Sequence, residues 1–152
     1  MIEINKILSF IININEKKLL LLKGSPGDPQ FKKPLWYVVT GSCEKIDKTK
    51  EDTVKREIKE ETNLDSQKII YLNWILKYMS LGRKCIEYAF ITYVNNGTII
   101  LNEENSDYEW YNIDKFIEKI DWFGDKNILK LVLSSAMDGE LYFKNEHIDD
   151  FI

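Results

Sequence analysis

Three glutamates, Glu57, Glu60 and Glu61, lie within five consecutive positions of one charged segment. Residues three and four apart share one face of an α-helix, so these carboxylates point the same way if the segment is helical. Each like-charge pair at that spacing destabilises an exposed helix by roughly 0.2–0.5 kcal/mol. A hard divalent cation would reverse the sign, because Mg²⁺ prefers carboxylate and water oxygens together with substrate phosphates. The spacing therefore indicates a metal site for phosphate chemistry, with Mg²⁺ as the expected cation and Mn²⁺ as the alternative.

The alternative interpretation is a solvated helix face, in which Lys55, Arg56 and Lys59 supply the counter-charges, as in most charge runs. The context favours the metal site, because the segment follows a strand, a glycine-containing turn and a loop of suitable length. Other catalytic centres are harder to build. The chain has two distant cysteines and one histidine, which excludes a Cys/His zinc site and argues against Ser-His-Asp or Cys-His chemistry. Catalysis must run on carboxylates, lysine or arginine.

The composition fits a single compact domain over residues 1–152, since 44% of the residues are hydrophobic. A net charge of −4 and a pI near 5.2 argue against a nucleic-acid coat or a basic membrane-surface module. No apolar run approaches the roughly 18–20 residues that a membrane span needs, and no secretory cleavage site follows the apolar N-terminus. We expect a cytoplasmic protein, with a homodimer left open.

The elements that must position the glutamates follow from periodicity and turn residues. A helix over 51–62 contains no glycine or proline, and Thr49 with Asp52 three residues later predicts its N-cap and acidic first turn. The Asn96-Gly97 turn predicts a further strand after it. Strands around one central helix, with helices at the end, describe an α+β domain. The expected strands are 2–14, 19–22, 35–39 (closed by a turn at 40–42), 68–78, 85–94, 99–101 and 108–111; a loop covers 24–29, and the later helices are 114–120 and 126–134.

The glutamate segment resembles the signature box of the Nudix hydrolases, GX5EX7REUXEEXGU, where U is a bulky aliphatic residue. The second half of the box is present as Arg56-Glu57-Ile58-x-Glu60-Glu61-x-Asn63-Leu64. The preceding Trp36-Tyr37-Val38-Val39-Thr40-Gly41-Ser42 is similar to the strand and turn that lead into the box. The resemblance extends over nearly the whole chain and implies the Nudix fold, an α/β/α sandwich with a mixed sheet.

Carried over by position, the resemblance assigns roles to individual residues. The segment 102–110 resembles the acidic loop that precedes a tryptophan-containing strand in several subfamilies, and it supplies one further carboxylate, Glu104. Arg56 orients the glutamates through paired hydrogen bonds. The implied metal ligands are the Ser42 carbonyl, Glu57, Glu60 and Glu61, and the implied catalytic residues are Arg56, Glu57, Glu60 and Glu104.

Three positions depart from the box. Asn63 replaces a glycine that ends the helix in the left-handed conformation, which asparagine also tolerates. Ser42 replaces a glycine whose backbone carbonyl is the part used. Lys48 replaces the first glutamate of the box, and a lysine cannot accept the hydrogen bonds that this glutamate accepts. Glu44 or Glu51 are the candidate replacements.

The substrate follows from weaker similarities. The segments around Gly41 and Glu104 are most similar to the subfamily that hydrolyses dATP and dihydroneopterin triphosphate, which implies pyrophosphate release from a nucleoside or pterin triphosphate. Lys33 is expected to meet phosphate, and Trp36 and Tyr78 to stack on a ring. The alternatives are a dinucleoside polyphosphate, a nucleotide-sugar, a capped RNA end, or a catalytically silent nucleotide-binding module. The low pI makes a nucleic-acid substrate unfavourable.

Overall fold

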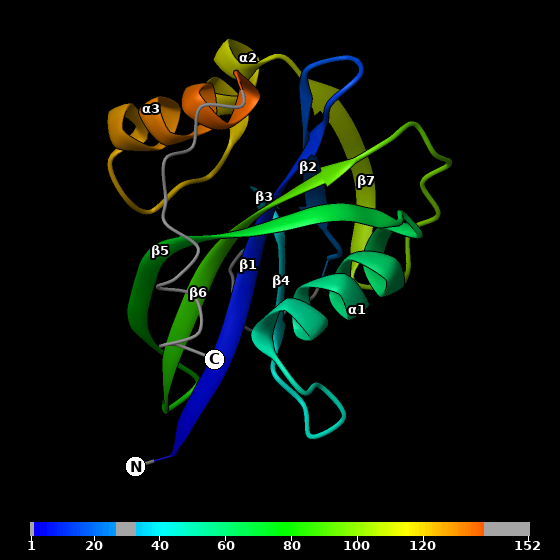
Figure 1. Ribbon diagram of the computed structural model, residues 1–152. Coiled ribbons are helices and arrows are strands. Elements are labelled where there is room, and N and C mark those ends of the chain that lie inside the picture. The colour runs from blue at the N-terminus through cyan, green and yellow to red at the C-terminus, as the bar shows by residue number, and fades with distance from the viewer. Residues whose placement is uncertain (1, 27–32, 139–152) are drawn as a thin grey trace.

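The computed structural model describes residues 2–26 and 33–138 (Figure 1). The predicted loop at 24–29 therefore lies partly outside the described residues, and the C-terminal segment 139–152 lies outside them altogether. The described elements are β1 (Glu3–Asn13), β2 (Lys18–Gly24), β3 (Trp36–Tyr37), β4 (Val39–Ser42), α1 (Lys50–Thr62), β5 (Ser66–Ser80), β6 (Arg83–Val94), β7 (Asn105–Tyr111), α2 (Ile113–Lys119) and α3 (Lys126–Met137).

The strands form one mixed sheet with β1 at its centre. β1 runs parallel to β6 along its whole length, and β6 continues antiparallel into β5. β2 pairs with β1 only near Ile12 and Asn13, whereas β4 pairs with β1 at residues 6–9. β2 instead pairs with β3 and β7 over much of its length. β1 and β2 therefore diverge, and the chain from β3 to β4 crosses from one to the other.

Alternate residues of β1 face two separate cores. Leu8, Phe10 and Ile12 belong to a cluster that includes residues of α2 and α3, while Ile7 and Ile11 belong to a cluster that includes residues of α1. This alternation is the period-two geometry of a strand buried on both faces. The α+β sandwich with a mixed sheet, predicted above, is confirmed (Figure 1).

Helix α1 begins and ends as its sequence predicts. The Thr49 hydroxyl accepts a hydrogen bond from the Asp52 backbone N–H, and the Asp52 carboxylate accepts one from the Thr49 N–H, so the capping box is complete. At the other end, Asn63 has φ 67° and caps the helix in the left-handed conformation. Val54 and Ile58 are fully buried, and each contributes roughly 1.5–3 kcal/mol to anchoring the helix on the sheet.

Two local predictions are wrong. Residues 99–101 form no strand; the Ile100 N–H donates to the carbonyl of Thr62, so the backbone pairs with the end of α1 instead of the sheet. The segment 40–42 is not a turn but part of β4, because Thr40, Gly41 and Ser42 pair with β1. Among the helices of the described residues, none is long and apolar enough to cross a membrane.

Candidate metal centre

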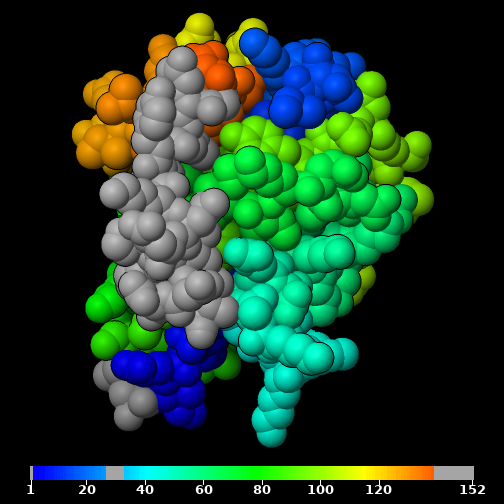
Figure 2. Space-filling view, viewed as in Figure 1, coloured from blue at the N-terminus to red at the C-terminus, as the bar shows by residue number. Residues whose placement is uncertain are grey.

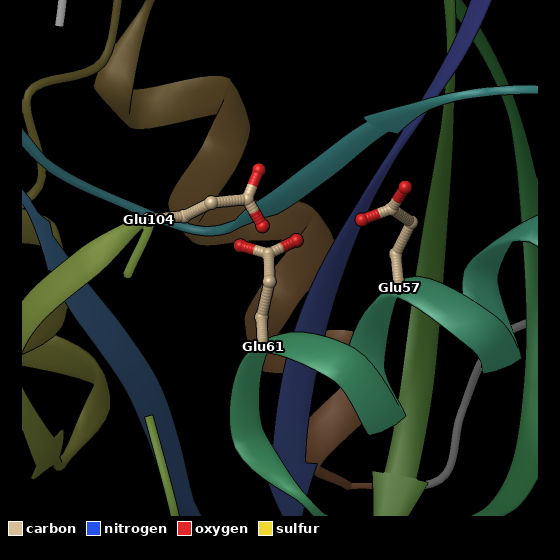
Figure 3. A group of neighbouring side chains, drawn as sticks. All are labelled: Glu57, Glu61 and Glu104. Carbon is tan, nitrogen blue, oxygen red and sulfur yellow. The ribbon is translucent and has the colours of Figure 1, made fainter. Parts of the chain in front are cut away.

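Three carboxylates from two elements converge at the start of β7. Glu57 and Glu61 come from α1, and Glu104 comes from the residue before β7. One oxygen of each carboxylate lies within 4.8 Å of the others. Figure 3 shows the Glu61 and Glu104 carboxylates facing each other, with that of Glu57 beside them. The structure thus joins Glu104 to the predicted glutamates, although more than 40 positions separate it from α1 in the sequence.

The cluster is electrostatically costly as it stands. Glu57 and Glu61 are buried, whereas Glu104 is exposed. Burial raises the pKa of Glu61 to about 9, helped by the negative charges of Glu104 and Glu57. Burial also raises the pKa of Glu57, against the opposing effect of Arg56. Asn105 donates a hydrogen bond to Oε1 of Glu61, but Oε2 is buried and has no hydrogen-bond partner in the described part of the chain.

These properties fit a divalent cation. The donors are carboxylate oxygens, which hard cations such as Mg²⁺ prefer. A cation would compensate the mutual repulsion of the three groups and satisfy the unpaired oxygen of Glu61. Glu57, Glu61 and Glu104 are the residues that would hold it. Buried carboxylates without such a partner would be destabilising. The donor set and the unpaired oxygen of Glu61 therefore both indicate a cation.

Gly41 leaves the space that Glu57 occupies. A Cβ atom at position 41 would overlap the side chain of Glu57, including its carboxyl carbon. Glu57 can keep its position only with glycine at 41, because a Cβ atom there would push the end of the Glu57 side chain aside; the constraint is contact with a carboxylate and not turn geometry. The sequence prediction treated this glycine as part of a turn. Its relation to Glu57 depends on how β4 pairs with β1.

Arg56 is hydrogen-bonded to two glutamates of α1 and to the end of β4. Its Nη1 donates to Glu57 at 3.0 Å and to Glu60 at 3.3 Å, and its Nη2 donates to the Ser42 carbonyl at 3.1 Å. One guanidinium thus connects the helix to the end of β4. Its contact with Glu57 favours the ionised form of that carboxylate, which a cation would need. These hydrogen bonds support the orienting role that the resemblance implies for Arg56.

Asp47 is the residue that sequence reasoning missed. Its two carboxylate oxygens accept hydrogen bonds from Nε and Nη2 of Arg56, at 3.0 and 2.8 Å. One of these oxygens also accepts from the Thr53 hydroxyl and the Glu44 backbone N–H. These bonds hold the pKa of Asp47 well below its usual range, the bond from Arg56 most of all. The expected replacements for the missing box glutamate were Glu44 and Glu51, and Glu44 lies 4.0 Å from Arg56.

Asp47 thus makes the two-pronged contact with arginine that Lys48 cannot make. Because it immediately precedes Lys48, its position in the loop could have pointed to this role. The loop projects from the body of the molecule below α1, as Figure 2 shows in cyan. Within it, Asp47 is held against Arg56 by two hydrogen bonds. A one-residue shift along an irregular loop has no periodic signal in the sequence.

The remaining predicted ligands occupy different positions. Glu60 is exposed and contacts Arg56, and it lies outside the three-carboxylate cluster. The Ser42 carbonyl accepts from Arg56. Glu60 and the Ser42 carbonyl are thus linked to the cluster only through Arg56, which also donates to Glu57.

The predicted substrate-binding residues come from three places: the segment before β3, β3 itself and β5. Lys33 is exposed before β3, and Trp36 is partly buried, with Nζ of Lys23 6.0 Å from its ring. Tyr78 lines a cavity of about 550 Å³ together with Tyr37 and the loop at 122–124. Of the three predicted residues, Tyr78 is the one that lines this cavity.

A family model described as NUDIX domain matches residues 6–132. Comparison with curated protein sequences gives no match. Among solved structures, the chain is similar to a MutT protein from Methanosarcina mazei Go1, with 20% identity and a TM-score of 0.66 over 91% of this chain and 95% of that one. It is similar to an Ap4A hydrolase from C. elegans, with 17% identity and a TM-score of 0.66 over 93% and 100% of the two chains. The E. coli dihydroneopterin triphosphate pyrophosphohydrolase gives 19% identity and a TM-score of 0.64 over 86% and 95%.

Proposed function

The chain belongs to the NUDIX family and is a hydrolase acting on pyrophosphate bonds, and from this premise we propose that it releases pyrophosphate from a (deoxy)nucleoside triphosphate or dihydroneopterin triphosphate. The observation that carries the proposal is the convergence of Glu57, Glu61 and Glu104 around a space suited to a divalent cation. The similar structures include an Ap4A hydrolase and a dihydroneopterin triphosphate pyrophosphohydrolase, so they support the reaction class more than the substrate. A cytoplasmic location and a homodimer stay predictions from the sequence.

The residues divide the work as follows. Glu57, Glu61 and Glu104 would hold the cation, which we take to be Mg²⁺, and Glu60 supplies a further carboxylate that contacts Arg56. When bound, such a cation neutralises charge on the diphosphate and lowers the pKa of a coordinated water. Arg56 fixes the orientation of Glu57, and Gly41 keeps β4 close to it. Glu104 is exposed and on a separate element, which suits it to accept the proton of the attacking water.

In the overall reaction, water attacks phosphorus, the bond to the bridging oxygen breaks, and a monophosphate and pyrophosphate leave. Lys33 and the aromatic residues near β3 are proposed to contact the phosphates and the ring. The silent-module alternative does not fit an enzyme of this family. The other phosphate-containing substrates are separated from the triphosphates by the experiment below.

The test is pyrophosphate and phosphate release, with and without Mg²⁺, across dNTPs, NTPs, dihydroneopterin triphosphate, diadenosine tetraphosphate and ADP-ribose. Turnover of triphosphates that is lost with chelator and in Glu57→Gln would support the proposal. Glu118→Gln is the matched control, because Glu118 is an exposed helical glutamate that pairs with Lys115 far from the cluster. Turnover confined to ADP-ribose or diadenosine tetraphosphate would overturn the substrate assignment. Undiminished turnover in Glu57→Gln would overturn the metal site.

A direct binding measurement complements turnover. Mn²⁺ titration followed by its paramagnetic effect on water relaxation reports the cation without any chemistry. We expect Glu57→Gln and Glu61→Gln to weaken Mn²⁺ binding by about tenfold or more, as loss of a charged ligand does. Equal Mn²⁺ affinity in the parent and both variants would show that the carboxylates hold no cation.

A further inference from the structure

The cavity that Tyr78 lines lies on the sheet face that carries α2 and α3. Leu76 and Trp122, which line the cavity, pack against the core cluster that contains residues of those helices. The cavity has a volume of about 550 Å³, within the range of small-molecule sites. Its rim includes exposed apolar side chains, Met79, Leu81 and Phe123, of which Phe123 is 74% exposed. Exposed apolar side chains that gather around one cavity mark a contact surface for a ligand.

The cavity has a preformed aromatic wall. The rings of Tyr37 and Trp122 stack with centroids 6.0 Å apart and planes at 19°, and Phe123 lies 5.9 Å from Tyr37. Two backbone contacts fix this wall to β3: the Trp36 N–H donates to the Asp121 carboxylate, and the Asp121 N–H donates to the Trp36 carbonyl, both at 2.9 Å. A planar ring can therefore enter a site whose aromatic surfaces are already in place.

One buried carboxyl group, that of Glu87 on β6, lines this otherwise aromatic cavity. Glu87 is 3% exposed, and its Oε2 accepts a hydrogen bond of 2.8 Å from the Tyr78 hydroxyl. Burial raises the pKa of Tyr78, and Glu87 raises it further, so Tyr78 keeps its proton and donates. Burial raises the pKa of Glu87, and the hydrogen bond from Tyr78 and the charge of Lys6 on the neighbouring strand oppose that rise. Glu87 is thus arranged as a hydrogen-bond acceptor within the cavity.

We propose that this cavity binds the ring of the substrate and that Glu87 selects a ring edge bearing two adjacent N–H donors. A ring N–H beside an exocyclic amino group, the 2-amino-4-oxopyrimidine edge shared by guanine and pterins, matches a carboxylate acceptor. Adenine and cytosine present a ring-nitrogen acceptor beside their amino group, which would face the carboxylate with a lone pair. The inference rests on the proposed function and narrows its substrate to guanine or pterin triphosphates.

The cavity and the metal centre are joined by one short segment of chain. Tyr37 of the aromatic wall and Gly41, which faces Glu57, lie four residues apart in the segment that forms β3 and β4. At about 3.3 Å per residue, extended chain of that length spans roughly 13 Å. A ribose or a short pterin side chain followed by phosphates covers a span of this order. The same segment can therefore carry a ring at one end and a phosphate group at the other.

The first experiment measures ring recognition without chemistry. Calorimetric titration in the presence of chelator compares guanosine, inosine, neopterin and adenosine with the parent protein. Inosine is the matched ligand, because it lacks only the 2-amino group of guanosine. We expect guanosine or neopterin to bind at least about tenfold more tightly than inosine and adenosine. Tighter binding of guanosine identifies a nucleotide, and tighter binding of neopterin identifies a pterin; equal binding of all four, or none, would overturn the inference.

The second experiment uses Glu87→Gln, which is nearly isosteric and keeps one acceptor. We expect KM for dGTP or dihydroneopterin triphosphate to rise by about 10- to 100-fold with little change in kcat, while dATP hydrolysis serves as the internal reference. Glu3→Gln, an exposed residue paired with Lys84 on the same sheet, is the control variant. Metal-dependent hydrolysis with no ring preference and a silent Glu87→Gln would overturn the inference and leave the proposed function intact. Selective nucleoside binding that depends on Glu87, without hydrolysis of any substrate, would support the inference about the cavity and overturn the proposed function.

Discussion

Replacing Asp47 by asparagine tests whether this residue takes the part of the missing box glutamate. The change keeps the shape of the side chain but turns an acceptor that meets Arg56 into an amide N–H₂. The Asp47 side chain is 4% exposed, so water cannot replace the lost contacts. One of the two hydrogen bonds from Arg56 is removed and the other is weakened, because the retained amide oxygen carries no charge; a charge-assisted bond contributes about 1.5–3 kcal/mol, and Arg56 retains Glu57 and Glu60. We therefore expect the free energy of unfolding to fall by about 2–3 kcal/mol.

Two assays read the effect. In thermal unfolding, about 2–4 °C per kcal/mol in a domain of this size gives a Tm lowered by about 4–12 °C. In the pyrophosphate-release assay at a temperature where both proteins are folded, kcat/KM should fall by about 10- to 100-fold, because Arg56 no longer holds Glu57 in place. Asp65→Asn is the control, because Asp65 forms an ion pair with Lys59 of α1, the helix that also carries Arg56, but its side chain is 78% exposed. We expect it to change stability by less than about 1 kcal/mol.

The neighbouring Lys48 sharpens the test. With Asp47 present, Lys48→Glu should leave activity near the parent value, because the guanidinium of Arg56 already has its two-pronged partner. In the Asp47→Asn background, Lys48→Glu should restore part of the lost activity by returning a carboxylate to the box position. If Asp47→Asn keeps the parent Tm and kcat/KM, Arg56 does not depend on Asp47 and the reasoning is refuted.

Three further outcomes follow from the same geometry. In chelator, the free energy of unfolding should fall as pH rises from about 4.5 towards 9, because the folded-state pKa of Glu61 lies above its unfolded value and folding retains a proton. Urea unfolding at pH 6 and pH 8 measures this fall. An equal fall with pH in Glu61→Gln would contradict the prediction. Gly41→Ala should lower stability by about 1–3 kcal/mol and activity by at least about tenfold, because its Cβ displaces Glu57; unchanged Mn²⁺ binding and turnover would refute that contact. Thr49→Ala should lower the free energy of unfolding, measured by chemical denaturation, by about 1 kcal/mol, because it removes the N-cap of α1. Turnover at low temperature should be retained. Loss of turnover without loss of stability would show that Thr49 has another role.

The features of helix α1 could be predicted from its local sequence. Its cap, its acidic first turn, its buried face and its left-handed end at Asn63 all depend on residues within the segment itself. The spacing of Glu57 and Glu61 likewise follows from helical periodicity alone. The long strands β1, β5 and β6 were also predictable, because apolar runs and turn residues bound them.

Other features depend on partners far away in the sequence. Residues 99–101 have the composition of a strand, but the end of α1 takes the N–H of Ile100. The segment 40–42 reads as a turn, but the free edge of β1 pairs with it. In each case the backbone hydrogen bonds go to whichever partner the fold places nearby, which local composition does not encode.

The sequence by itself determined the family signature, the class of fold and the carboxylate-bearing face of α1, because these depend on residue types at short, fixed spacings. The family resemblance had suggested Glu104, and the tertiary structure brings it against Glu57 and Glu61. Only the tertiary structure decided that Asp47 binds Arg56 and that Glu87 lies in an aromatic cavity with Tyr78. The physical reason is that carboxylates gain their function from burial and from partners brought together by sheet pairing. Those distances are set by the path of the whole chain and not by any one segment of it.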